Sequence, residues 1–166
     1  MIVIAALITL LFGAWLQGSQ FNFLLPVRLD PLLIMTVVWG ATMGKRQGAI
    51  YGLLAGALED LLIGGGGLFV IPKILIGWAA GSLKPMLYYR QLLVILPLVA
   101  LFTVLQESWV MVALTLRVHG YFLRHLGAIA LPEVVGNLLI TWPLYALVKF
   151  SLTWGQKRWG FRRGLE

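Results

Sequence analysis

Residues Gly52 to Gly81, GLLAGALEDLLIGGGGLFVIPKILIGWAAG, set two acids and one lysine within an apolar, glycine-rich sequence. Its four consecutive glycines, Gly64–Gly67, predict a flexible turn between two antiparallel helices. An ionisable residue inside an apolar helix needs a partner or a wet cavity. The placement of Glu59, Asp60 and Lys73 therefore bears on both fold and function.

The composition of the whole chain is that of a protein solvated by lipid. Of its 166 residues, 60% are hydrophobic and 11% are charged, and the mean hydropathy is +0.92. So few polar residues cannot cover a water-facing surface. We therefore expect one transmembrane domain over residues 1–166, with no separate soluble domain.

The sequence lacks the usual signatures of an enzyme. It has no cysteine, which excludes disulfides, thiolate zinc sites and a cysteine nucleophile. His119 and His125 fall beside Arg117 and Arg124 in a connection, without HExxH or G-x-S-x-G spacing, and the GGGG turn is no Walker sequence. The net charge of +7 sits at the ends of apolar segments, which favours membrane topology over nucleic acid. We expect no catalytic residues, metal or cofactor.

Apolar segments predict an all-α integral membrane protein, a compact bundle of six transmembrane helices. The second segment is short, because about fourteen residues at about 1.5 Å each do not cross a hydrocarbon core of about 30 Å. It could be a short packed span or a re-entrant segment. The first lacks the basic start and cleavage site of a signal peptide, so we expect it to be retained. The segments are Met1–Leu16, Pro31–Gly44, Gly48–Ile63, Leu68–Leu83, Leu92–Leu116 and Ala128–Ser151.

Basic residues orient the six segments. With six spans, three basic residues fall on one side, namely Arg28, Arg117 and Arg124, and Lys73 lies within a span. The other nine share the opposite side, so the positive-inside rule makes both termini cytoplasmic. These nine are Lys45, Arg46, Lys84, Arg90, Lys149, Lys157, Arg158, Arg162 and Arg163.

Glycines recur four residues apart in the middle of the chain. In lipid this spacing creates a smooth helix face on which another backbone can approach closely. Packing between helices of this chain is the favoured interpretation, and docking of a helix from another protein is the alternative. The glycines are Gly40, Gly44, Gly48, Gly52, Gly56, Gly77 and Gly81.

The ionisable residues of the opening stretch are expected at the same depth in the membrane. Asp60 lies four residues before the glycine turn and Lys73 six after it, so both sit about 6–9 Å below the outer helix ends. We expect Asp60 and Lys73 to form a buried ion pair. Because adjacent helical residues point about 100° apart, Glu59 then needs another partner or a proton.

Two further acids, Glu107 and Glu133, are expected in the same outer half. The predicted intramembrane polar cluster therefore holds Glu59, Asp60, Lys73, Glu107 and Glu133. It could line a functional pocket, since intramembrane charges usually face a cavity or the bundle interior. It could equally be a structural ion pair with bonded or neutral acids around it.

The chain ends in a basic, aromatic segment, residues 152–166. We expect an interfacial cytoplasmic tail there, because Trp rings favour the headgroup level and basic residues favour anionic lipid. The alternatives are a solvated tail that only sets orientation and a docking site for a cytoplasmic partner. The residues concerned are Trp154, Lys157, Arg158, Trp159, Arg162 and Arg163.

The run from Pro31 to Gly81 resembles the rod shape-determining protein MreD family. The resemblance rests on PLLIM, the GKRQGAIYGLLAG turn, LEDLL, the glycine turn and PKILIGWAAG, about a third of the chain, while length and hydropathy agree over the rest. It implies that Asp60, Lys73 and Gly77 match family positions. One departure is that Asp30 precedes Pro31, where the family often has Pro-Asp-Leu.

That resemblance implies a multi-pass protein of the bacterial inner membrane that acts as a non-enzymatic scaffold in cell-wall elongation. It implies direct binding to the single-span protein MreC, and indirect links to MreB filaments, RodA and its partner transpeptidase. The family's fold is similar to the S components of energy-coupling-factor transporters. A small-molecule or lipid binder with an outward-facing polar pocket is therefore the alternative, although the first segment, with Ala5, Ala6, Gly13 and Ala14, lacks a regular small-residue repeat.

Overall fold

A computed structural model describes residues 2–18, 28–87, 91–115 and 130–160. These residues form six α-helices and one short 3-10 helix, with no strand among them, so the all-α prediction is confirmed for the described chain. The elements are α1 Ile2–Gly18, α3 Pro31–Met43, α4 Lys45–Ile63, α5 Val70–Ser82, η1 Lys84–Leu87, α6 Gln91–Thr115 and α8 Leu131–Gly160.

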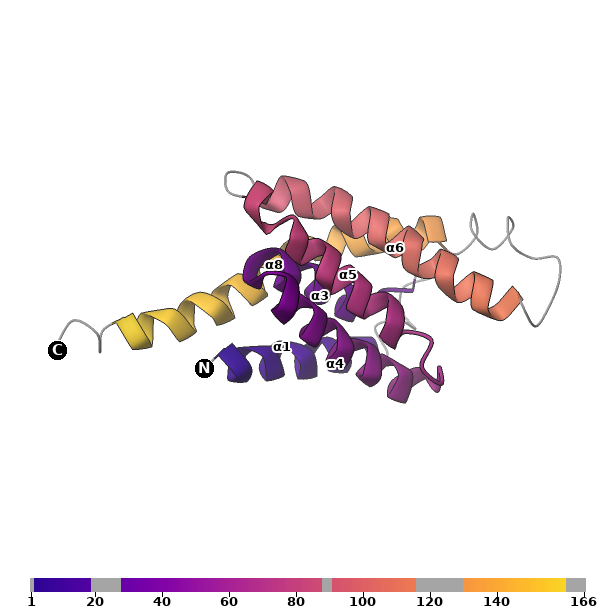
Figure 1. Cartoon of the computed structure of the whole chain (residues 1–166), viewed down its shortest axis with the longest axis horizontal. Helices are drawn as coiled ribbons and strands as arrows, with labels where there is room; N and C mark the ends of the chain where they lie inside the picture. The colour runs from indigo at the N-terminus through magenta and orange to yellow at the C-terminus, as the bar shows by residue number, and fades with distance from the viewer. Residues whose placement is uncertain (1, 19–27, 88–90, 116–129, 161–166) are drawn as a thin grey trace.

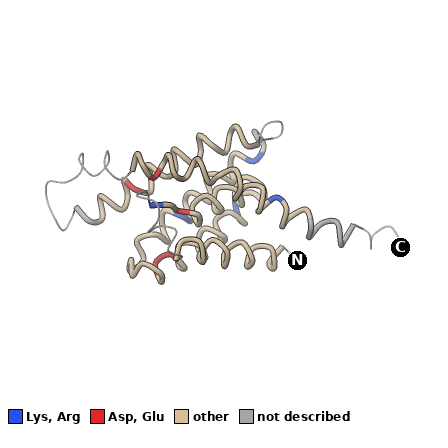
Figure 2. Tube along the Cα trace, turned by 180° about the vertical axis from the view of Figure 1, so that it is seen from behind, with Lys and Arg blue, Asp and Glu red and all other residues tan. Residues whose placement is uncertain are grey.

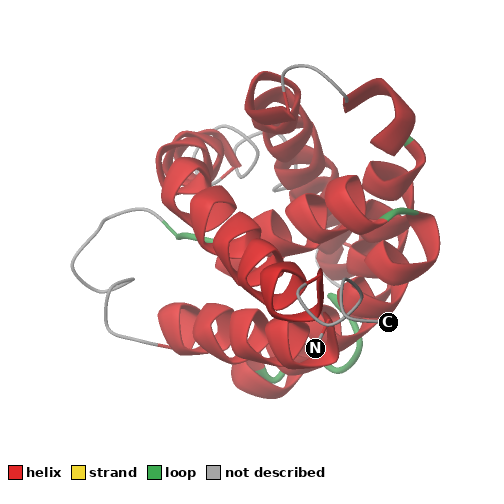
Figure 3. Ribbon diagram, turned by 90° about the vertical axis from the view of Figure 1, so that its left-hand side faces the viewer, coloured by secondary structure: helices red, strands yellow, loops and turns green. Residues whose placement is uncertain are grey.

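Helix α3 lies at the centre of the bundle (Figure 1) and packs against all five of the other α-helices. Every residue from Pro31 to Ala41 is buried, which is why this helix carries an apolar sequence on all its faces. Its 13 residues make it a short central helix. The described chain consists of helices joined by short loops (Figure 3).

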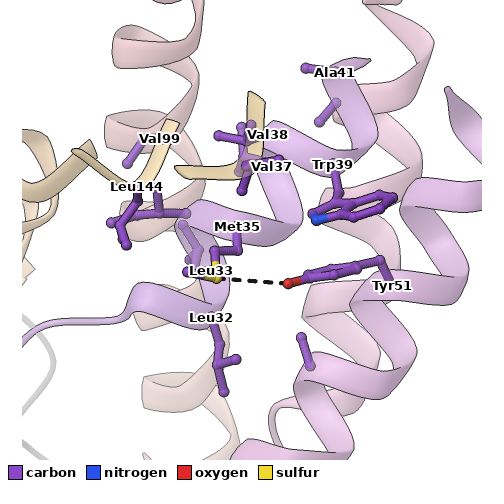
Figure 4. Packing of buried hydrophobic residues seen from close by; sticks show 14 of the residues in the cluster. Leu32, Leu33, Met35, Val37, Val38, Trp39, Ala41, Tyr51, Val99 and Leu144 are labelled. Atoms are coloured by element: carbon purple, nitrogen blue, oxygen red, sulfur yellow. Dashed lines mark hydrogen bonds between the residues drawn. The ribbon is translucent and has the colours of Figure 1, made fainter. Parts of the chain in front are cut away.

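An aromatic pair joins the first three helices in the core (Figure 4). The rings of Trp39 and Tyr51 stack with centroids 5.1 Å apart and an interplanar angle of 13°. Trp39 Nε1 donates to Thr9 Oγ1 at 3.0 Å, and the Tyr51 hydroxyl lies 3.1 Å from the same oxygen and 3.7 Å from Met35 Sδ. The indole N–H and the two hydroxyl groups buried between α1, α3 and α4 therefore satisfy one another.

The recurring glycines of α4 face the backbone of α5. A methyl group added at Gly48 would overlap the carbonyl of Gly77, and one added at Gly52 would overlap the carbonyl of Lys73. At Gly56 it would lie 2.6 Å from the Cα of Val70. This glycine seam is therefore occupied by α5 of the same chain, and the two helices approach as closely as backbones can.

The remaining glycines of the repeat lie at contacts between α3, α4 and α5. The methyl group of an alanine at Gly40 would meet Ala80 and Gly81 of α5. Gly44 separates α3 from α4 without a loop, because its φ of 101° is open to glycine but strained for other residues. Helix α4 thus begins at Lys45, three residues earlier than the apolar pattern predicts.

The glycine turn closes α4 and leads directly to α5. Gly64 adopts a left-handed conformation with φ 75° and donates its N–H to the carbonyl of Asp60. This is a usual way to satisfy a helix C-terminus.

The C-terminal helix is longer than the apolar pattern indicates. Helix α8 has 30 residues and continues to Gly160, whereas the sequence predicts an end at Ser151 and a tail from 152. The expected tail residues Trp154, Lys157, Arg158 and Trp159 therefore belong to a helical backbone. Arg162 and Arg163 lie outside the described residues, as do His119, His125, Arg117 and Arg124 of the expected external connection.

Two helices contain stretches long and apolar enough to cross a membrane. They are Leu92–Ala113 in α6, with 22 residues, and Leu131–Thr153 in α8, with 23 residues. Their outer faces carry exposed apolar side chains, such as Leu139 at 74% and Trp142 at 68%. Helices α1, α3 and α5 are apolar but shorter.

The glycine seam generates the first prediction. Replacing Gly52 by leucine should destabilise the bundle by about 1–3 kcal/mol or more, because the new side chain separates two backbones that touch. The matched control is Leu53→Phe, which adds bulk at the next position, where the side chain is 44% exposed. Thermal unfolding in detergent measures both; equal stability of the two variants would refute the importance of the seam.

Candidate functional site: a buried polar cluster

The ammonium group of Lys73 is the centre of the candidate site. Lys73 lies in the first turn of α5 and is fully buried, with 0% exposure. Its Nζ lies 2.7 Å from Asp30 Oδ2 and 2.7 Å from Glu59 Oε2. Because no water reaches it, these two carboxylates stabilise its charge. We refer to these three residues as the Lys73 trio.

Asp30 is the carboxylate with the most partners. It is the N-cap of α3, where Oδ1 accepts the backbone N–H of Leu33 at 2.8 Å, and Pro31 follows at the first helical position. Its Oδ2 accepts from Gln106 Nε2 at 2.6 Å in addition to Lys73, and its own N–H donates to Asn137 Oδ1 at 2.9 Å. One side chain thus caps a helix and pairs with a buried cation.

A shell of neutral polar groups surrounds the Lys73 trio. Gln17 Nε2 donates to Glu59 Oε1 at 2.8 Å, and Asn137 Nδ2 donates to Thr103 Oγ1 at 3.1 Å. Each of the described α-helices contributes a polar residue to the cluster, either from within the helix or, for α3, from its N-cap. The contributions are Gln17 from α1, Asp30 from the start of α3, Glu59 from α4, Lys73 from α5, Gln106 from α6 and Asn137 from α8.

The expected Asp60–Lys73 pair is wrong. Asp60 instead accepts the backbone N–H groups of Phe69 and Val70 at 3.2 Å, and so caps the start of α5 across the glycine turn. Glu59 takes the place beside Lys73. Depth alone could not separate two adjacent acids, because the direction of each side chain around α4 decides which one faces α5.

Glu107 and Glu133 also lie inside the bundle, with exposures of 4% and 2%. Glu133 is in the first turn of α8, and its carboxyl lies within electrostatic range of Glu107, Asp30 and Lys73. The structure therefore brings these two acids toward the Lys73 trio. Glu133 Oε2 and Gln106 Oε1 are buried without a hydrogen-bond partner among the described residues.

Asp30 is the residue that sequence reasoning missed. The predicted polar cluster omits it, because Asp30 falls just before the apolar segment that begins at Pro31. The signal that could have found it is Asp30-Pro31 before an apolar run, since aspartate at the N-cap with proline at the first position is a typical helix start.

Charges are separated along the bundle (Figure 2). Acidic segments gather in the half away from the N-terminal end of α1, together with some basic ones, and the remaining basic segments lie in the other half. The basic residues in that other half are Lys45 and Arg46 at the start of α4, Lys84 in η1 and Lys149 in α8. We call this half the basic end.

The cavities in the described residues are predominantly apolar. One, of about 290 Å³, lies between α1 and α8 and is lined by residues such as Phe12, Leu16 and Leu144. Another, of about 280 Å³, lies between α5 and α6 and has Gln106 as its polar lining residue. Within the described residues no three His, Cys, Asp or Glu side chains converge to hold a metal. Comparisons with protein-family models, curated proteins and solved structures gave no match to this chain.

The Lys73 trio generates the second prediction. Lys73→Met should destabilise the protein by about 3–5 kcal/mol, because it leaves Asp30 and Glu59 buried without a cation. Removing all three charges in Asp30→Asn/Glu59→Gln/Lys73→Met should restore part of that loss. Thermal unfolding in detergent measures the variants, and a triple variant at least as unstable as Lys73→Met contradicts the argument.

A matched control uses the acid next to Glu59. Asp60→Ala removes a cap, which costs about 1 kcal/mol. Its effect should add to that of Lys73→Met within about 0.5 kcal/mol, whereas Glu59→Gln should couple to it more strongly. A larger coupling for Asp60 than for Glu59 would reinstate the pair that the geometry excludes.

Proposed function

We propose that this chain is a non-enzymatic scaffold of the MreD type in the bacterial inner membrane, with six spans and both termini cytoplasmic. In this role it binds the single-span protein MreC directly. Through that contact it helps connect MreB filaments to RodA and its partner transpeptidase in cell-wall elongation.

The observation that carries the proposal is the packing of the segment from Pro31 to Gly81. The stretch that resembles the MreD family is also the stretch in which α3, α4 and α5 pack through glycine backbones. Lys73 there is held by carboxylates from two other segments. A rigid, internally satisfied unit suits a scaffold, because its outer faces keep a constant shape for partner helices.

Charge placement supports the proposed orientation. Lys45, Arg46, Lys84 and Lys149 belong to one end of the bundle, and the glycine turn belongs to the other. The positive-inside rule makes the basic end cytoplasmic. The buried polar cluster then lies in the outer half.

Apolar outer faces support partner binding within the membrane. Large side chains such as Leu61 at 81% and Leu139 at 74% are exposed on different helices. In lipid such faces cost nothing to expose, so they suit either acyl chains or a single-span helix. The proposed contact with MreC uses this kind of face.

A small-molecule or polar-lipid binder of the S-component type is the second candidate. The observation that favours it is the pair of buried acceptors without hydrogen-bond donors, Glu133 Oε2 and Gln106 Oε1. Buried polar atoms normally have partners, so a polar ligand that donates hydrogen bonds could complete this part of the cluster.

Co-expression with MreC from the same bacterium tests the scaffold proposal and gives the third prediction. The two proteins should co-purify in mild detergent, and the complex should survive Glu133→Gln, because that residue belongs to no proposed contact. Native mass spectrometry of the complex identifies both chains and any retained small molecule. A folded chain that fails to retain MreC, while a small molecule remains bound, would favour the second candidate instead.

The fourth prediction concerns topology. Reporter fusions after Lys45, Arg90 and Glu166 should read as cytoplasmic, and a fusion within Gly64–Gly67 should read as external, because nine basic residues would otherwise face outward. Alkaline phosphatase and fluorescent-protein fusions measure the two sides. Opposite activity at any of the first three sites contradicts the six-span arrangement.

A further inference from the structure

The basic end has positive charge with no acid beside it in the described chain. Lys45, Arg46, Lys84 and Lys149 are all exposed there. The five described acids belong to the other half: Asp30 begins α3, Glu59 and Asp60 end α4, Glu107 lies in the second half of α6 and Glu133 begins α8. The counter-charge must therefore come from outside these residues.

Two of these cations converge from different elements. The break at Gly44 places Lys45 at the first position of α4, where its backbone packs on Gly81 of α5. Lys84 follows the end of α5, and its Cδ lies 3.6 Å from the position that a Cβ at Gly44 would occupy. Lys45 and Lys84 therefore lie on the same corner of the bundle.

An aromatic side chain marks the level of this corner. Lys45 Nζ lies 5.9 Å from the ring centroid of Trp78, and Trp78 is 52% exposed. Indole rings favour the boundary between headgroups and hydrocarbon. A lysine over such a ring holds its charge at headgroup depth.

An apolar groove begins beside the same residue. The cavity of about 280 Å³ between α5 and α6 includes Ala79, the neighbour of Trp78, and extends to Pro72. Ala79 and Pro72 are seven residues apart on the helix, so the groove extends about 10 Å along α5 toward the membrane centre. Apart from Gln106, its walls are aliphatic and aromatic, with Leu75, Phe102 and Leu105 among them.

We propose that this corner binds one anionic phospholipid, with its phosphate between Lys45 and Lys84 and an acyl chain in the groove between α5 and α6. Charge complementarity selects an anionic headgroup, and the adjoining apolar groove selects a molecule that carries a hydrocarbon chain. Neither a free phosphate nor an acidic peptide has both parts. The site does not depend on binding to MreC, so it goes beyond the proposed scaffold function.

The test uses the purified full chain in a neutral detergent and native mass spectrometry. Phosphatidylglycerol and phosphatidylcholine with identical acyl chains are added in separate arms, and inorganic phosphate in a third. Each lysine near an anionic surface contributes about a five-fold preference. Wild-type protein should therefore retain phosphatidylglycerol at least about five-fold better than phosphatidylcholine.

Single substitutions locate the site. Lys45→Gln and Lys84→Gln should each reduce retention of phosphatidylglycerol about five-fold, whereas Lys149→Gln, which removes the same charge elsewhere at the basic end, should change it less than about two-fold. Ala79→Phe, which fills the groove, should reduce retention of both lipids. Leu105→Trp is the second groove variant, used if Ala79→Phe lowers thermal stability.

Each other outcome overturns the proposal. Equal retention of the two lipids shows that the site does not select an anionic headgroup. If Lys149→Gln reduces retention as much as Lys45→Gln and Lys84→Gln do, the lipid responds to general surface charge and there is no defined site. Unchanged lipid retention in a stable groove variant shows that no acyl chain binds in the groove between α5 and α6. Retention of inorganic phosphate equal to that of phosphatidylglycerol shows that the lipid chain has no part in binding.

Discussion

The buried ion pairs of Lys73 hold α3, α4 and α5 in register with one another. An ammonium group at 0% exposure is unstable unless carboxylates lie within direct contact, and here two do. One of them, Asp30, begins α3, and the other, Glu59, is near the end of α4. The ion pairs therefore relate the ends of three helices, and a shift of any one of them along its axis would separate a charge from its partner.

Close backbone approach is what allows these ion pairs to be short. The carbonyl of Lys73 faces Gly52, one of the α4 glycines that lie in contact with α5. A side chain at that position would move α5 outward and carry the ammonium away from Glu59, which lies two turns further along α4. The glycine seam and the Lys73 trio are thus one arrangement, in which small residues set the distance and charges set the register.

Much of this could be predicted from sequence, because apolar runs and glycine spacing act locally. The helical class, the glycine turn and the burial of Glu107 and Glu133 follow from such patterns. The partner of Lys73 does not, because it depends on the direction of Glu59 around α4 and on Asp30, which is 43 residues away in the chain. Likewise, apolar character ends near Ser151 but α8 continues to Gly160, since a polar sequence can prolong a helix that is already formed.

The separation of charge along the bundle has a consequence for where partners can bind. In the half with the acids, the charged groups of the trio are satisfied by one another and by amides of surrounding helices. These three charges would gain little from an outside ligand, because their partners already lie within the bundle. At the basic end, Lys45 and Lys84 are exposed and have no acid beside them in the described chain. The lysines of the basic end are therefore available to an anionic group from outside, and the sides of the bundle are available for apolar packing.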